Sequence, residues 1–448
     1  MRLLIVSLCA TLCASTVAAQ LTPEQSRLRE IYKQLVEINT THSTGGTTAA
    51  AEAVAKRLRA AGIRAKDIQI LGPVPNKQNL VARLHGNGTR QPLLLLAHLD
   101  VVEAKRSDWS IDPFKLNEKD GYFYGRGTLD DKAMAAIFVD IFLRLNQQKV
   151  KLDRDVILAL TADEEGGPDD GAKWLVQTHR PLVDAEMVLN EGGGGRTRQG
   201  KYLNNGVQAS EKAYMSYRLE VRNPGGHSSL PRKDNAIYQL AAALGRLQQF
   251  EFPFELNEVT RLYFEQSART ESPEVAADMQ AILHDPPDAA AVKRLSDMPS
   301  YNALLRTTCV PTRLEGGHAD NALPQTAAAL VNCRIMPGHS GDEVQKVLAG
   351  VIGDDQVTIA PTEVDTSGPA SPLNLELMKS IERLTNEMWP GVPVLPTMSS
   401  GATDSRYFRQ AGIPAYGVSG LFVDVDDVRA HGRDERLGVK ELYDGQTF

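Results

Sequence analysis

The stretch Leu93–Asp100, LLLLAHLD, decides the expected fold. Four consecutive leucines after Pro92 predict a short strand buried on both faces, as in a parallel sheet. The strand ends in two polar residues, His98 and Asp100, and ligands gather at this end of the strands in open α/β sheets. A histidine with a carboxylate two residues on is typical of a metal-binding imidazole whose second nitrogen is held by an acid. A histidine after an apolar run is nevertheless more often structural, so this stretch needs support from elsewhere in the chain.

The same pattern recurs at other predicted strand ends. The apolar run 156–161 is followed by Asp163-Glu164-Glu165, and the run 185–189 is followed by Asn190-Glu191 and four glycines. Asp130 and Asp131 precede an apolar helix predicted over 133–145, where they could also act merely as a helix cap. Together the pattern collects an imidazole and several carboxylates, namely His98, Asp130, Glu164 or Glu165, and Glu191. This mixture suits zinc, or cobalt or manganese, and its carboxylates favour two metal ions sharing a bridging acid.

The first 19 residues predict an exported protein. Arg2 precedes an apolar run, and Val17-Ala18-Ala19 forms a small-residue cleavage site, so residues 1–19 are expected to be a signal peptide. The apolar run is shorter than the roughly 18 residues that a membrane span needs. The net charge of −7, without long basic runs, argues against nucleic acid or an anionic membrane as a partner. Cys309 and Cys333 remain after cleavage, and the sequence leaves open whether they pair or stay buried thiols.

Two kinds of periodicity divide the mature chain. Residues 20–212 and 367–448 carry buried-strand and helix patterns of an α/β unit, which we expect to form a mixed, largely parallel sheet flanked by helices. Residues 213–366 contain strands with one wet face and an amphipathic helix, which predict an inserted α+β unit, the lid. A polar, helix-prone segment at 251–300 within the lid carries no recognisable chemistry.

The ordered set of motifs resembles the M20 metallopeptidase family, with the carboxypeptidase S and N-acyl amino acid hydrolase branch as the nearest pattern. The resemblance covers nearly the whole mature chain. It rests on AHLD (97–100), GRGTLDDK (125–132), DEEGG (163–167), NEGGGG (190–195), PGGHSS (224–229), DNALP (320–324), SGATDSRYF (400–408) and the segment around His431. It implies a zinc-exopeptidase type of catalytic domain and a lid that also serves dimerisation.

The resemblance also implies a two-metal site. In the family pattern His98 and Glu191 bind one metal, Glu165 and His431 bind the other, and the carboxylate of Asp130 bridges both. The resemblance also implies a cis peptide bond between Asp130 and Asp131. Asp100 would orient the His98 ring, and Glu164 would be the general base that takes a proton from the metal-bridging water. The resemblance assigns substrate contacts to His227, Arg334, Asn321 and Gly401. His227 would stabilise the oxyanion, and in dimeric relatives this histidine comes from the partner subunit. Arg334 would hold a free carboxylate, with Asn321 nearby.

These implications predict a dinuclear metal-dependent hydrolase that cleaves peptide or amide bonds next to a free carboxylate. Its expected substrates are dipeptides, C-terminal peptide bonds or N-acyl amino acids, and the alternative is a deacylase specific for N-acyl amino acids. A non-catalytic binding scaffold is a third hypothesis, disfavoured because Glu164 and all five ligand positions are present. The exposed sheet and helix of the lid could form a homodimer, or the 251–300 segment could block that surface, so the sequence leaves monomer and dimer as alternatives.

Overall fold

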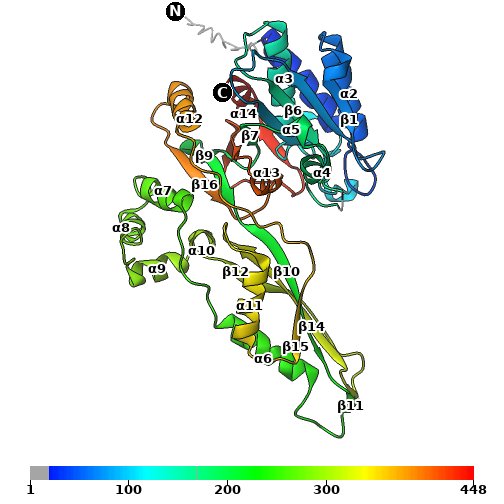
Figure 1. Ribbon diagram of the computed structural model, residues 1–448, viewed down its shortest axis with the longest axis vertical. Helices are drawn as coiled ribbons and strands as arrows, with labels where there is room; N and C mark the ends of the chain where they lie inside the picture. The colour runs from blue at the N-terminus through cyan, green and yellow to red at the C-terminus, as the bar shows by residue number, and fades with distance from the viewer. Residues whose placement is uncertain (1–19, 168) are drawn as a thin grey trace, which may run out of the picture.

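The computed structural model describes residues 20–167 and 169–448. Figure 1 shows two bodies, one built from the N-terminal and C-terminal parts of the chain and one, built from its middle, that extends away from the first. The predicted signal peptide, residues 1–19, lies outside the described residues. Within the described ranges, no helix is both long enough and apolar enough to cross a membrane.

The first body contains a ten-stranded mixed sheet, the large sheet, in which the predicted strand β3 (Leu93–His98) lies centrally between β6 and β7. Its pairs β3–β6, β3–β7, β7–β17, β9–β16 and β8–β18 are parallel, and its other pairs are antiparallel. The remaining strands are β1 (Ile68–Leu71), β2 (Asn79–Leu84), β6 (Val156–Thr161), β7 (Met187–Asn190), β8 (Gly194–Arg198), β9 (Lys201–Glu211), β16 (Val394–Ser399), β17 (Ala415–Gly417) and β18 (Phe422–Asp424). The expected fold class, a mixed and largely parallel sheet with flanking helices, is confirmed.

Helices on both faces of the large sheet explain why β3 is a run of leucines. Leu95 packs into a core shared with one helical layer, while Leu94 and Leu96 pack into a core on the opposite face. Successive side chains of a strand point to opposite faces, so a strand covered on both sides needs apolar residues at every position. The first layer contains α1 (Pro23–Glu37), α2 (Thr48–Ala60), α3 (Lys132–Gln147) and α14 (Val439–Thr447), and the second contains α4 (Gly171–Thr178), α5 (Arg180–Val183) and α13 (Ser405–Gln410).

The middle of the chain forms an antiparallel four-stranded sheet, which we call the lid sheet, in the order β12-β14-β10-β15. Alternate residues of β10 point into a core beneath two helices, as its alternating pattern indicated. The antiparallel pair of short strands β11 (Gly226–His227) and β13 (Ala322–Leu323) lies at the end far from the large sheet (Figure 1). The other elements are β10 (Ala213–Arg222), β12 (Thr308–Gly316), β14 (Thr326–Ile335), β15 (Val357–Pro361), α6 (Ala236–Gln248) and α11 (Gly341–Ile352).

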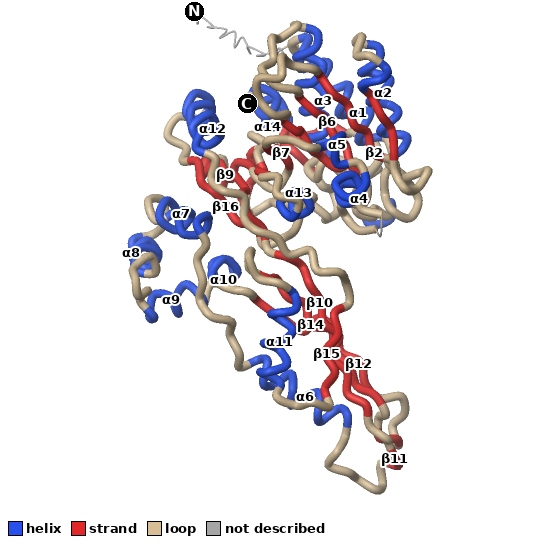
Figure 2. Tube along the Cα trace, viewed as in Figure 1, coloured by secondary structure: helices blue, strands red, loops and turns tan. Residues whose placement is uncertain are grey.

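The segment that periodicity could not place forms four short helices with a small core of their own. Figure 2 shows them as a separate group beside the lid sheet and β16. The first of them, α7, packs on β16, and Val259 shares a core with Met398 of that strand and with α12 (Leu375–Met388). This group therefore connects the lid sheet to the large sheet. Its helices are α7 (Glu258–Ser267), α8 (Pro273–Ala281), α9 (Ala289–Ser296) and α10 (Pro299–Leu305).

The two cysteines that the sequence left open form a disulfide bond. Cys309 and Cys333 are directly opposite each other on the neighbouring strands β12 and β14. The bond therefore joins the edge strand of the lid sheet to its interior.

A small three-stranded sheet joins the C-terminal segment to the strand that directly precedes the GRGTLDDK motif. In it β19 (Arg436–Gly438) pairs with β5 (Tyr122–Tyr124), which pairs with β4 (Asn117–Lys119). This pairing places the segment that contains His431 next to the loop that leads to Asp130.

Candidate metal centre

Four segments of the chain deliver polar side chains to one edge of the large sheet. His98 is the last residue of β3, Glu191 directly follows β7, and Glu164 and Glu165 lie just after β6. Asp130 comes from the loop before α3. Because parallel strands end at the same edge, the sequence pattern of strand followed by acid or imidazole becomes one cluster in space.

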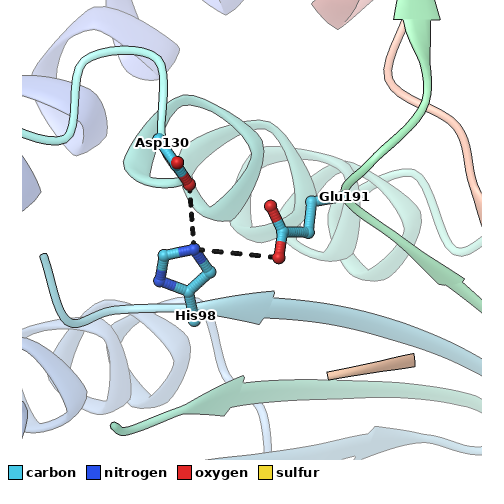
Figure 3. Close-up of side chains that lie close together, drawn as sticks. All are labelled: His98, Asp130 and Glu191. Carbon is cyan, nitrogen blue, oxygen red and sulfur yellow. Dashed lines mark hydrogen bonds and ion pairs between the residues drawn. The ribbon is translucent and has the colours of Figure 1, made fainter. Parts of the chain in front are cut away.

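The first group of ligand atoms surrounds the His98 ring. His98 Nε2 lies 3.1 Å from Asp130 Oδ1 and 3.9 Å from Glu191 Oε1, as Figure 3 shows. All three residues offer atoms within 4.8 Å of one another, a spacing that suits a single ion. The predicted grouping of His98, Asp130 and Glu191 is therefore present in the geometry.

The second group surrounds His431. Its Nε2 lies 2.9 Å from Glu165 Oε2 and 3.1 Å from the other oxygen of Asp130, Oδ2. Asp130 thus presents one oxygen to each imidazole, and its peptide bond to Asp131 is cis, as the family resemblance implied. The structure brings together all five residues that were expected to bind metal.

The donor set fits two divalent cations. Two imidazoles and three carboxylates are ligands that zinc, cobalt and manganese accept. The buried Oε1 of Glu165 has no hydrogen-bond partner among the described residues, so a lone pair in this cluster is left for another group. Divalent ions in the two groups would compensate the concentrated negative charge, with Asp130 positioned to bridge them.

The pKa of Asp130 is shifted in the opposite direction from the pKa values of the carboxyl groups of Glu164 and Glu191 beside it. Burial works against ionisation of Asp130, but hydrogen bonds from His431 and His98 outweigh it and lower its pKa. Burial raises the pKa of Glu191 well above its ordinary value, and it raises the pKa of Glu164 to about 8. Hydrogen bonds to Asp130 and Glu165 raise the pKa of His431 to about 10. The cluster holds protons tightly, and bound cations would take their place.

Asp100 orients His98 mainly through its backbone. The ring nitrogen Nδ1 of His98 lies 3.0 Å from the Asp100 carbonyl oxygen and 3.6 Å from its carboxylate. The carboxylate instead accepts the backbone N–H groups of Glu164 (3.2 Å) and Glu165 (3.0 Å). Asp100 therefore ties the end of β3 to the turn that carries the expected base and one expected ligand.

Sequence reasoning missed two residues that support this cluster. The fully buried Glu435 accepts the backbone N–H groups of Gly127, Leu129 and Asp130 and pairs with Arg126 at 2.6 Å. It thereby holds the bridging acid against the C-terminal segment. The only local signal was an acid four residues after His431, which no periodicity distinguishes from a surface charge.

The second missed residue is Lys77. Its ammonium group lies 2.7 Å from the carboxylate of Asp163, whose backbone is left-handed at φ 59°. Asp163 begins the turn that presents Glu164 and Glu165, so this ion pair holds the turn in addition to the contacts of Asp100. Lys77 lies in a loop before β2, where the sequence offers no sign of a partner so far along the chain.

A cavity of about 470 Å³ adjoins the ligand cluster. Asp130, Glu191 and the glycines 192–195 line it, together with polar residues such as Arg196 and Thr397. Apolar residues form much of the rest of its wall, namely Leu129, Met134, Leu421, Val423, Val425 and Val428. A volume of this size and an apolar wall suit the hydrocarbon part of a small ligand. No sequence pattern had indicated this cavity, because its wall is assembled from short segments far apart in the chain.

The residues expected to bind substrate are not gathered in one chain. His227 and Asn321 are both exposed and lie together at the β11–β13 strand pair, where the backbone N–H of Ser228 donates a hydrogen bond to the Asn321 carbonyl at 3.0 Å. Arg334 is at the opposite end of β14, eight residues from Thr326, which corresponds to about 26 Å of extended strand. Asn321 therefore does not lie near Arg334 within one chain.

Arg334 and Gly401 are both near the junction of the two sheets. Arg334 stacks over the ring of Tyr214, 4.7 Å from its centroid, at the start of β10. Gly401 follows β16 and donates its N–H to Ser399 Oγ at 3.0 Å, and Ser399 lines the cavity beside the ligand cluster. These two residues remain on the side of the molecule that contains the metal centre.

Comparisons with known proteins identify the class. The family model described as peptidase family M20/M25/M40 matches residues 94–448, so the chain belongs to this family. Among solved structures, the M20 family metallo-carboxypeptidase Sso-CP2 from Sulfolobus solfataricus superposes with a TM-score of 0.71 at 18% identity, covering 95% of this chain and 97% of that one. The chain is a hydrolase of the M20 type.

Relatives at higher identity narrow the branch. An N-fatty-acyl-amino acid synthase/hydrolase PM20D1 of Xenopus tropicalis is 32% identical over 359 residues, which cover 78% of this chain and 70% of that protein. A probable carboxypeptidase S-like protein of Dictyostelium discoideum is 30% identical over 365 residues, covering 78% of this chain and 69% of that protein. Both lie in the branch that the sequence motifs had indicated.

Proposed function

We propose that this protein is an exported dinuclear metal-dependent hydrolase that cleaves an amide or peptide bond next to a free carboxylate. The observation that carries the proposal is the geometry of Asp130, whose two oxygens face two separate imidazoles, His98 and His431. Zinc is the metal most consistent with this ligand set, and cobalt or manganese would also fit. The signal-like residues 1–19 and the Cys309–Cys333 bond support export to the periplasm or the medium.

Two bound ions would supply Lewis acidity and a water molecule of lowered pKa. Glu164 would accept a proton from a water molecule while the oxygen of that water attacks the substrate carbonyl carbon. The same carboxyl group then delivers the proton to the nitrogen of the leaving amine as the C–N bond breaks. A carboxylate beside the attacking water can carry the proton between these two steps.

The substrate-binding half of the site is proposed to be completed by a second copy of the chain. The oxyanion contact of His227 and the contact of Asn321 would come from the β11–β13 strand pair at the tip of the partner's lid sheet. The exposed apolar residues Tyr238, Val310 and Leu314, on α6 and the edge strand β12, offer a surface for such a homodimer. Arg334 would bind the substrate carboxylate through its planar guanidinium group.

The alternative function, deacylation of N-acyl amino acids, has an observation in its favour. The cavity beside Asp130 and Glu191 has an apolar wall that suits an acyl group better than the charged amino terminus of a dipeptide. The relative named N-fatty-acyl-amino acid synthase/hydrolase supports the same direction. Dipeptides remain the competing substrate class.

A panel of substrates tests these proposals directly. Metal-depleted protein is assayed with dipeptides, N-acyl amino acids and an amide that lacks a free carboxylate, before and after addition of zinc, cobalt or manganese. Metal-restored cleavage that requires the carboxylate is the expected result, and the preferred panel member identifies the substrate class. Folded, metal-loaded protein that cleaves nothing would favour the non-catalytic scaffold.

A further inference from the structure

A second cavity, of about 660 Å³, lies in the body that contains the lid sheet. It is enclosed by the C-terminal half of α6, the segment around 250–252 and the beginning of β12. None of its lining residues belongs to the ligand cluster or to the cavity beside it. Its volume is that of a small-molecule site, and the proposed hydrolysis makes no use of it.

The walls of this lid cavity are mostly hydrocarbon. Leu244 and Leu247 come from α6, and Val331 comes from β14. Phe250 and Phe252 contribute two rings that pack edge to face with centroids 5.0 Å apart. Rigid aromatic and aliphatic walls of this kind favour an apolar occupant.

One end of the cavity is polar and incompletely satisfied. The buried Arg306 pairs with Glu251 at 2.5 Å and donates to Ser296 Oγ at 2.9 Å, but its Nε has no hydrogen-bond partner among the described residues. Asn302, which also lines the cavity, has a buried Oδ1 in the same condition. Buried polar groups are normally paired, so a buried guanidinium group that lines the cavity and is only partly paired favours a ligand with an anionic acceptor.

The charge behind this polar end favours an anion. The fully buried Lys212 donates to the Arg306 carbonyl at 2.7 Å and to Thr308 Oγ at 3.3 Å, and Thr308 lines the cavity. Among the described residues Lys212 contacts no carboxylate, and burial together with Arg334 lowers its pKa to about 7. The side chain of Glu251 is 72% exposed, so it compensates these buried cations only weakly.

We propose that the lid cavity binds a fatty acid, with its hydrocarbon chain between α6 and β12 and its carboxylate at Arg306. The carboxylate pairs with the guanidinium group of Arg306, which lines the cavity, and offsets its positive charge. This binding site is separate from the metal centre and does not depend on the proposed hydrolysis.

A glycine in the cavity wall allows a clean test. Gly245 of α6 lines the cavity, and a Cβ atom built there would meet no atom within 4 Å, so the bulky side chain of Gly245→Trp can start from this backbone position and occupy the cavity. Gly350 of α11 is equally unobstructed but does not line the cavity, which makes Gly350→Trp the matched control. Isothermal titration calorimetry of laurate into the metal-loaded proteins measures the affinity.

We expect wild type and Gly350→Trp to bind one laurate per chain and Gly245→Trp to bind it at least tenfold more weakly. Hydrolysis by Gly245→Trp should equal that of wild type, because Gly245 contacts no catalytic group. Arg306→Gln should weaken laurate binding about tenfold and leave dodecanol binding unchanged.

Three results would overturn the proposal: no saturable laurate binding by wild type, equal binding by Gly245→Trp, or equal affinity of wild type for dodecanol and laurate. A repeat with metal-depleted wild type separates this site from the metal centre. Unchanged laurate affinity supports the lid cavity, and loss of binding on metal removal refutes it.

Discussion

The carboxyl edge of the large sheet and the tip of the lid sheet carry the two halves of the expected site, and they differ in completeness. At the sheet edge His98, Asp130 and His431 meet in one chain, with ligand atoms within hydrogen-bond distance. At the tip His227 and Asn321 are exposed at the short β11–β13 strand pair, remote from that edge (Figure 1). A metal centre can thus be complete within one chain while the substrate contacts require either a large movement or a second copy.

The metal centre at the edge of the large sheet is tested most directly by Glu164→Gln, for which we expect the largest effect. The amide keeps the shape of the carboxyl group but cannot accept the proton, so kcat should fall about a thousandfold or more. Metal content, measured by atomic absorption, should equal that of wild type because Glu164 is in neither ligand group. Activity within tenfold of wild type would mean that another residue is the base.

The substrate contacts at the lid tip are tested by His227→Ala. Its kcat should fall about a hundredfold to a thousandfold because an oxyanion contact is lost. Mixing His227→Ala with Glu164→Gln should restore activity, because each mixed dimer contains one site with both residues intact. Recovery is measured after partial unfolding and refolding of the mixture. Failure of two folded, dimeric variants to complement each other would rule out the exchange of His227 between chains.

The two bodies should also differ in how they respond to loss of the disulfide bond. Replacing both Cys309 and Cys333 with alanine opens a loop of 24 residues, and we expect the free energy of unfolding of the lid sheet to fall by about 3 kcal/mol. Urea titration followed by circular dichroism measures the change. Hydrolysis at low temperature should be retained, and wild-type stability in the double variant would mean that the bond contributes nothing to the fold.

The smallest expected effect concerns pH and the metal-free protein. Burial, opposed by His98 and Arg406, raises the pKa of Glu164 from 4.5 to about 8, so the folded state holds a proton that the unfolded state releases above pH 4.5. The stabilisation from this proton is complete below 4.5 and is lost as the pH rises through 8. The melting temperature of metal-depleted protein should therefore fall over this range, by a few degrees more in wild type than in Glu164→Gln.

Differential scanning fluorimetry with a chelator provides this measurement. The metal-loaded protein is the control, because bound cations compensate the same carboxylates and should flatten the curve. Parallel curves for metal-depleted wild type and Glu164→Gln would show that the Glu164 proton does not contribute to stability.

The sequence was most informative where one short segment contains both a fold signal and a chemical group. His98 and Glu191 were predicted because each directly follows an apolar strand, and parallel strands bring their carboxyl ends together. His431 required the family motifs, since no local pattern marks it. The sequence did not predict the roles of Glu435 and Lys77. Glu435 accepts backbone N–H groups and Lys77 pairs with the Asp163 carboxylate, and these partners become neighbours only after folding.

The helical group α7–α10 and the two cavities are further features whose arrangement the sequence could not predict. The helices could be anticipated from composition, but their packing on β16 through Val259 could not. A cavity is the space left between elements, so its volume and lining depend on how distant segments pack. The apolar wall beside the metal centre is an example, because Met134 and Val428 are far apart in the chain.

By itself the sequence determined that buried strands would form a mixed sheet and that imidazole and carboxylate groups would collect at one edge, because strand periodicity and side-chain chemistry are local properties. Only the tertiary structure decided that Asp130 and Glu435, 305 residues apart, would meet and that His227 would lie far from His98. Such contacts depend on the pairing of whole strands, such as β5 with β19, and on the reach of the lid sheet. Neither is written in any single stretch of residues.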